Sequence, residues 1–181
     1  MARHIRLTGL LLAAVIGAVG AVSAGAAAQA SPVGRLTHAQ AVVQLRAAGI
    51  SWSASGGCTD RNNPTCTSFE GVRRSSISGV RRLRAASGCR VNVTGGTEAG
   101  HAAGVYSHGT GYALDISKGR CVGAYIRRSF AYVGYVPGWG HQYRAPSGNL
   151  YTDEGDHWDI VFYTCGGCAG GGRRSAAGVA G

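Results

Sequence analysis

Residues 106–116 contain two side chains that can hold a metal ion or act in catalysis. His108 and Asp115 lie seven positions apart, with two glycines between them. If the end of this stretch forms a strand, alternation places Ala113 and Asp115 on one face and apolar side chains on the other. A carboxylate in an apolar strand is costly to bury without a partner. We therefore predict that Asp115 faces a cleft, where it shares a metal ion with His108.

A second group of ionisable residues lies near the C-terminal end of the chain. His157 begins another alternating run, which predicts a strand that could face the same cleft. A catalytic zinc ion usually has three protein ligands and keeps its fourth position for water, and His108, Asp115 and His157 supply that number. Zinc lowers the pKa of such a water, and a nearby carboxylate takes its proton. Glu154 is the predicted base, with Asp156 as the alternative.

Three further residues could support this site. Asp159 shares the predicted face of His157, so we expect Asp159 to orient an imidazole as a partner outside the metal shell. His101 and His141 have the pattern of ordinary surface histidines. The alternative is that both line the cleft, bind substrate and help to hold a developing oxyanion.

The two motifs together resemble a known family. Ser107-His108-x-x-Gly111-x-Ala113-x-Asp115-Ile116, followed by Glu154-x-x-His157-Trp158, is similar to the zinc D-alanyl-D-alanine carboxypeptidases and related peptidoglycan peptidases of phages and bacteria. The resemblance implies that His108, Asp115 and His157 bind zinc and that Glu154 is the general base. It also implies the hedgehog/DD-peptidase fold, a small α+β domain with a central antiparallel sheet.

The sequence departs from this family at one position. Many members place an arginine before the first ligand, where it can position a substrate carboxylate. The corresponding residues 94–98 here are Thr-Gly-Gly-Thr-Glu. Arg90, Arg127 or Arg128 could take over that role. Because no residue is fixed for it, the sequence leaves open which peptide bond would be cleaved.

Both ends of the chain differ in composition from the rest. Residues 1–30 combine an early positive charge, an apolar run and Ala-Gln-Ala before Ser31, which predicts a cleaved signal peptide. No second apolar run approaches the length needed to cross a membrane, so we expect a secreted protein without an anchor in its mature form. Residues 31–168 form the predicted domain. Residues 169–181 are rich in glycine and arginine and predict a flexible tail.

Six cysteines favour a domain held together by disulfides in an exported chain. Pairing neighbours in the sequence predicts the bonds Cys58–Cys66, Cys89–Cys121 and Cys165–Cys168. The chain has 18 Lys and Arg against 8 Asp and Glu, a net charge of +10. This charge suits anionic wall polymers, but no motif for specific nucleic-acid recognition accompanies it.

The remaining pattern predicts helices at about 38–48, 76–86 and 121–133, with strands at 90–94, 111–116 and 157–163. Residues 135–151 predict turns with one or two short strands. These elements favour an α+β domain with an antiparallel sheet. We predict a secreted zinc metallopeptidase that acts on peptidoglycan stem peptides. The alternative is a non-catalytic zinc module that binds anionic wall polymer, as the similar hedgehog signalling domain works by binding partners.

Overall fold

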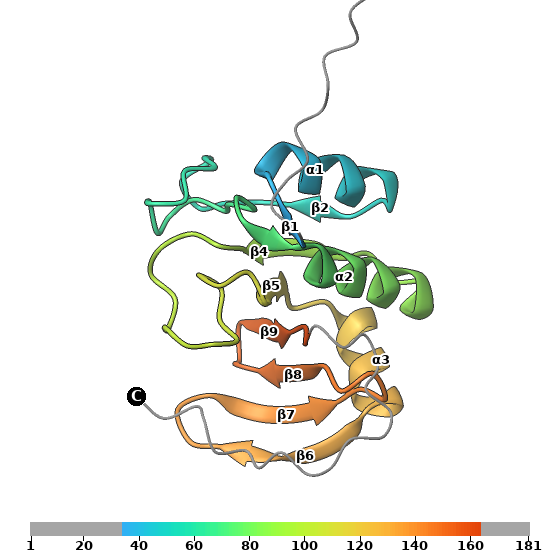
Figure 1. Cartoon of the computed structure of the whole chain (residues 1–181). Helices are drawn as coiled ribbons and strands as arrows, with labels where there is room; N and C mark the ends of the chain where they lie inside the picture. Colours follow the sequence, from blue (N-terminus) through green and yellow to red (C-terminus); the bar gives the residue numbers. More distant parts are fainter. Residues whose placement is uncertain (1–33, 164–181) are drawn as a thin grey trace, which may run out of the picture.

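Residues 34–163 are described by a computed structural model as an α+β domain with three helices and a mixed sheet (Figure 1). The seven-stranded sheet has the order β2-β4-β5-β9-β8-β7-β6, and β1 pairs separately with β3. The strands are β1 (Arg35–Leu36), β2 (Ser51–Trp52), β3 (Val72–Arg73), β4 (Asn92–Gly95), β5 (Ala113–Ser117), β6 (Ala131–Val136), β7 (Gly140–Arg144), β8 (Leu150–Asp153) and β9 (His157–Val161).

The large sheet is not wholly antiparallel, which corrects the predicted topology. The six strands β4-β5-β9-β8-β7-β6 pair antiparallel with one another, but β2 runs parallel to β4. The helix α1 (His38–Ala47) precedes β2, and α2 (Arg74–Ser87) lies between β2 and β4, so this connection is the helical crossover that parallel strands require. Two residues of β2 are too few to reveal an alternating pattern in the sequence.

Local sequence signals explain two of the three helices. Thr37 caps α1 (His38–Ala47), because its side chain accepts a hydrogen bond from the backbone N–H of Gln40 while the Gln40 side chain accepts one from the N–H of Thr37. The helix α2 (Arg74–Ser87) ends at Gly88, which adopts a left-handed conformation with φ 69°. Both helices lie close to their predicted positions.

The third helix is shorter than predicted. The helix α3 (Arg120–Ser129) ends where the backbone of Phe130 becomes extended, and β6 follows at once. Tyr132 and Val133, which were predicted to extend the helix, lie in β6 beside β7. Aromatic and β-branched residues favour strands, and strand pairing decides the outcome here. The region predicted to be mostly turns therefore contains part of a three-stranded antiparallel ribbon, β6-β7-β8.

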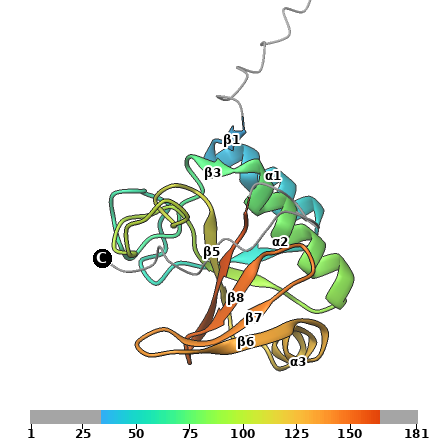
Figure 2. The ribbon, with the colours of Figure 1, turned by 60° about the horizontal axis from the view of Figure 1, so that its bottom comes forward.

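All three helices lie on one side of the large sheet, and long loops lie on the other (Figure 2). Leu114, Ile116, Trp158 and Ile160 are fully buried in the core that the helices share with the sheet. Glycine permits this close packing: a Cβ at Gly79 of α2 would lie 2.1 Å from the Phe162 ring. The alternate residues of β5 and β9 therefore face away from the helices.

The disulfides Cys58–Cys66 and Cys89–Cys121 are present as predicted. Disulfides indicate a non-cytoplasmic location. No helix among residues 34–163 is long and apolar enough to cross a membrane. The predicted signal peptide, the pair Cys165–Cys168 and the tail at 169–181 lie outside the described residues.

Candidate metal centre

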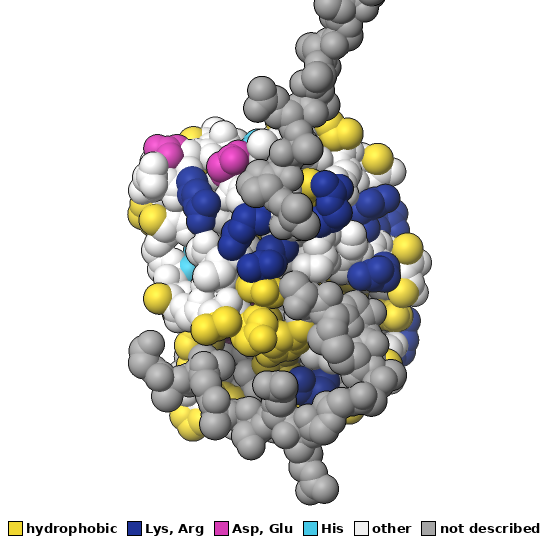
Figure 3. Space-filling model, viewed as in Figure 1, with side chains coloured by type: hydrophobic (Ala, Val, Ile, Leu, Met, Phe, Trp, Pro, Cys, Tyr) yellow, Lys and Arg dark blue, Asp and Glu magenta, His cyan; other side chains and the backbone are white. Residues whose placement is uncertain are grey.

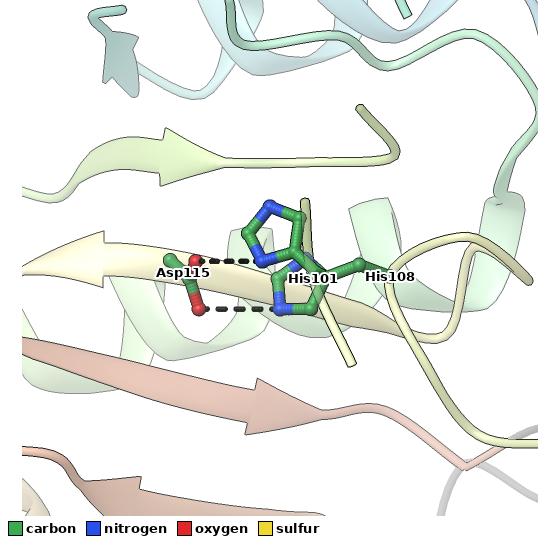
Figure 4. A group of neighbouring side chains, drawn as sticks. All are labelled: His101, His108 and Asp115. Atoms are coloured by element: carbon green, nitrogen blue, oxygen red, sulfur yellow. Dashed lines mark ion pairs between the residues drawn. The ribbon is translucent and has the colours of Figure 1, made fainter. Parts of the chain in front are cut away.

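Strand pairing brings the two predicted motifs together on the sheet face that is turned away from the helices. Asp115 of β5 lies directly opposite Asp159 of β9, and Ser117 lies opposite His157. The loop between β4 and β5 adds His101 and His108 above these strands (Figure 4). Because the site combines two strands and a loop, its shape depends on the register of the sheet.

Three histidines present a nitrogen to the carboxylate of Asp115. His108 Nε2 lies 3.3 Å from Asp115 Oδ1, and His157 Nε2 lies 3.6 Å from the same oxygen. His101 Nδ1 lies 3.7 Å from Asp115 Oδ2. The rings of His101 and His108 are stacked, with their centroids 3.8 Å apart. Asp115 is therefore the centre of the site, and it is only 7% exposed.

The other nitrogen of each imidazole is hydrogen-bonded away from Asp115. His108 Nδ1 lies 2.7 Å from the carbonyl oxygen of Gly96, which can only accept a hydrogen bond. His101 Nε2 donates to Glu98 Oε1 at 3.1 Å, and His157 Nδ1 donates to Asp156 Oδ1 at 2.6 Å. We call the nitrogen that faces Asp115 the inner nitrogen of each ring and the other one the outer nitrogen. These bonds fix the proton of each neutral ring on its outer nitrogen, so the inner nitrogens carry lone pairs. Partners of this kind typically orient metal-binding histidines.

This arrangement fits a metal cation. Lone pairs of neutral imidazoles that face a carboxylate repel it unless a proton or a cation lies between them. Asp115 Oδ1 is buried, and while the three imidazoles are neutral it has no hydrogen-bond donor within the described residues. Ligand atoms of His101, His108 and Asp115 lie within 4.8 Å of one another, so this group could hold a metal ion. Imidazole and carboxylate donors suit zinc but do not fix which metal binds.

Without a cation, protonated histidine would neutralise the site. Burial alone would lower the pKa of His108, but hydrogen bonds and charges from Asp115 and Asp159 outweigh burial and raise this pKa to about 10. Burial would raise the pKa of Asp115, whereas the neighbouring histidines, His108 first, lower it. The metal-free site therefore holds a protonated His108 beside an ionised Asp115.

Glu154 lies at the edge of this centre, in the turn between β8 and β9. Its Oε2 atom is 3.4 Å from His157 Nε2, while Oε1 is buried with no hydrogen-bond partner within residues 34–163. Burial, followed by the negative charge of Asp159, raises the pKa of Glu154. A carboxylate with a raised pKa is better matched to accepting and returning a proton near neutral pH.

The two aspartates near His157 lie on different sides of the imidazoles. Asp156 is exposed and holds the outer nitrogen of His157. Asp159 Oδ2 instead lies 3.3 Å from His108 Nε2, the inner nitrogen of that ring. The sequence predicted that Asp159 orients a metal-binding imidazole from outside the metal shell, which requires contact with the outer nitrogen of that ring. Because Gly96 already occupies that position on His108, Asp159 belongs to the inside of the centre.

His141 lies on the other face of the sheet. It is paired with Asp153 of β8, which is paired in turn with Trp158 of β9, so the three side chains share the face covered by α3. His141 contacts Tyr132 there, with His141 Nδ1 3.0 Å from the tyrosine hydroxyl. This placement is incompatible with the expectation that His141 lines the cleft of Asp115.

Two supporting groups were missed in the sequence. Glu98 is 3% exposed, and its carboxylate accepts hydrogen bonds from the backbone N–H groups of Ser68 and Gly96 as well as from His101. These bonds, led by that of His101, lower the pKa of Glu98 although burial opposes them. The spacing of three residues between Glu98 and His101 was the available signal. No pattern pointed to the Gly96 carbonyl.

Gly95 leaves space for the carboxylate of Asp115, so we expect Gly95→Ala to weaken metal binding. A Cβ at this position would lie 2.2 Å from Asp115 Oδ2, which forces the carboxylate to move. Zinc affinity should fall about 10- to 100-fold, the range found when supporting contacts of a metal site are removed. Competition with a chromogenic chelator measures the change.

Gly109→Ala provides the control for this substitution. Gly109 is adjacent to His108, yet a Cβ there would meet no atom within 4 Å. Its zinc affinity should match that of the wild type. Equal affinities for all three proteins would show that Asp115 does not need the space at Gly95.

Comparison of the chain with protein-family models, curated proteins and solved structures finds no match. The interpretation of this centre therefore depends on the geometry and chemistry of its own residues.

Proposed function

We propose that this chain is a secreted zinc metallopeptidase that hydrolyses peptide bonds, with peptidoglycan stem peptides as the substrate class. The observation that carries the proposal is the convergence of three oriented imidazoles on Asp115, with Glu154 beside them. His108, Asp115 and His157 are the proposed zinc ligands. The sequence resemblance supports the peptidase class and the DD-peptidase-like fold, and the disulfides are compatible with secretion.

The residues of the centre have distinct parts in the proposed reaction. When bound, zinc supplies Lewis acidity, which polarises a carbonyl and makes water more acidic. Glu154 accepts the proton of the attacking water and then returns a proton to the leaving amine. The carbonyl carbon gains the oxygen of water as its C–N bond breaks, giving a carboxylate and an amine. Asp156 and Gly96 keep the imidazoles of His157 and His108 in place through their outer nitrogens.

The experiment combines zinc analysis with digestion of muropeptides followed by mass spectrometry. We expect the purified protein to bind zinc and to release peptide fragments. Glu154→Gln should keep zinc but lower kcat about 10²- to 10⁴-fold, the usual contribution of a general base. Glu70→Gln is the matched control, because Glu70 is exposed and its side chain accepts a hydrogen bond from the backbone N–H of His38 at the start of α1.

Two results would contradict the proposal. A protein that neither contains nor takes up zinc would exclude the metal chemistry. Equal activity of wild type and Glu154→Gln would exclude Glu154 as the base.

A non-catalytic zinc module is the second candidate, and one observation favours it. His101 also presents an inner nitrogen to Asp115, so four protein donors are available. Four protein ligands are typical of structural zinc sites, in which no position remains for water. Such a module could bind anionic wall polymer through its arginines. It would bind zinc and purified wall material but release no peptides, and Glu154→Gln would leave wall binding unchanged.

A further inference from the structure

The centre is strongly acidic although the chain as a whole is basic. Five carboxylates lie at it or support its histidines: Glu98, Asp115, Glu154, Asp156 and Asp159. Within residues 34–163, their ion pairs are all with histidines. Among the same residues, the two ion pairs that involve lysine or arginine both go to Asp153. A divalent cation would balance only two of the five negative charges.

Most positive side chains of the described residues lie elsewhere. Arg61 reaches the loop of the centre, where its guanidinium donates hydrogen bonds to the carbonyl oxygens of Thr97 and Gly109. Lys118 and Arg127 reach Asp153 and the ring of Trp158, on the sheet face covered by α3. Arg128 lies over Tyr125 of the same helix. Figure 3 shows further Lys and Arg side chains gathered over the region of α1, α2 and β1. Neither Arg127 nor Arg128 is therefore placed to receive a substrate carboxylate at the centre.

Glu98 occupies the region in which the resembling peptidases carry an arginine. Its carboxylate is anchored by two backbone N–H groups and by His101, so it is a fixed part of the site rather than a mobile surface group. His101 connects Glu98 to the centre, because its other nitrogen lies 3.7 Å from Asp115 Oδ2. Negative potential at this position repels a substrate carboxylate and attracts an ammonium group.

We infer that the centre accepts peptides with an ammonium group beside the cleaved bond and disfavours peptides with a free carboxylate there. This inference rests on the proposed peptidase function and narrows its substrate class. It favours cleavage of internal bonds next to a diamino acid such as lysine. It disfavours removal of a terminal residue that carries the free α-carboxylate.

Three peptides that differ by one group test the inference with the zinc-loaded protein. The first is N-acetyl-D-Ala-Lys with a C-terminal carboxamide, so that the bond between its two residues lies beside both the ammonium group and the C-terminus, and the second has the free carboxylate. The third is the carboxamide with norleucine in place of lysine. We expect the first to be cleaved with a kcat/KM at least about tenfold higher than either of the others, and added salt should reduce these differences because it screens the charges. Equal values, or faster cleavage of the carboxylate peptide, would overturn the inference.

A variant connects the preference to Glu98. Glu98→Gln keeps an acceptor for His101 but removes the charge, so the ratio between carboxamide and carboxylate peptides should fall several-fold. Glu70→Gln is the control, because Glu70 is exposed and accepts a hydrogen bond from His38 at the start of α1. An unchanged ratio in Glu98→Gln would show that Glu98 does not determine the preference.

Calorimetric measurement of how tightly the same peptides bind tests the peptidase function and the charge preference separately. If no peptide is cleaved but the carboxamide lysine peptide binds most tightly, the peptidase function fails while the charge preference remains. If the peptides are cleaved and bound alike, the peptidase function remains and the charge preference fails.

Discussion

Replacing His108 with alanine should lower the affinity for zinc roughly 10²- to 10³-fold. Zinc bound by four ligands contributes about 10–16 kcal/mol, which corresponds to roughly 2.5–4 kcal/mol for each ligand. His108 is the most buried histidine of the centre, 4% exposed, and its inner nitrogen lies 3.3 Å from both Asp115 and Asp159. Its loss removes a donor and leaves two carboxylates without their shared partner. Competition titration with a zinc chelator measures the affinity.

His141→Ala is the matched control, because it removes an imidazole from the opposite face of the sheet. Its zinc affinity should equal that of the wild type. A similar loss of affinity in both variants would mean that the effect of His108→Ala is not specific to the centre described here.

His108→Ala should also change how the stability of the metal-free protein depends on pH. The pKa of His108 is raised from 6.5 to about 10, so its charge stabilises the fold fully below pH 6.5, and this contribution is lost as the pH rises toward 10. The wild type should therefore lose more stability than His108→Ala between these pH values. Urea unfolding with a chelator present measures the difference. Identical pH profiles would contradict the ion pair of His108 with Asp115 and Asp159.

Removing the disulfide Cys89–Cys121 should lower the free energy of unfolding by about 4 kcal/mol. The bond joins residues 32 positions apart, and the entropy of closing a loop of that length gives this magnitude. The closed segment contains His101, His108 and Asp115. We therefore expect the double variant Cys89→Ser/Cys121→Ser also to bind zinc less tightly. Urea unfolding and chelator competition measure the two effects.

The other disulfide supplies the comparison. Cys58 and Cys66 are only 8 positions apart, so their removal should cost about 2.5 kcal/mol by the same relation. This smaller loop contains none of the proposed ligands, and zinc affinity should change little. A larger loss from Cys58→Ser/Cys66→Ser would show that loop length does not determine how the two bonds stabilise this fold.

Alternation in the sequence predicted the faces of the two central strands. In β5, Leu114 and Ile116 are fully buried in the core beside the helices, while Asp115 faces away from it. In β9, Trp158 and Ile160 are fully buried, while His157 and Asp159 are half-buried. This information is local, because successive side chains of a strand point to opposite faces. The residue types also limited the chemistry to imidazole and carboxylate donors.

The sequence could not sort the remaining histidines. No local pattern separated His101 from His141, and the same role was considered for both. The fold separates them: His101 stacks on His108, whereas cross-strand pairing places His141 on the far face. The register of β7 against β8 decides that placement, and register depends on packing between distant segments. The sequence alone therefore determined which residues can bind a metal and which strand faces they share. Only the tertiary structure decided which of them meet, because the pairing of β5 with β9 and the path of the loop between β4 and β5 bring distant parts of the chain together.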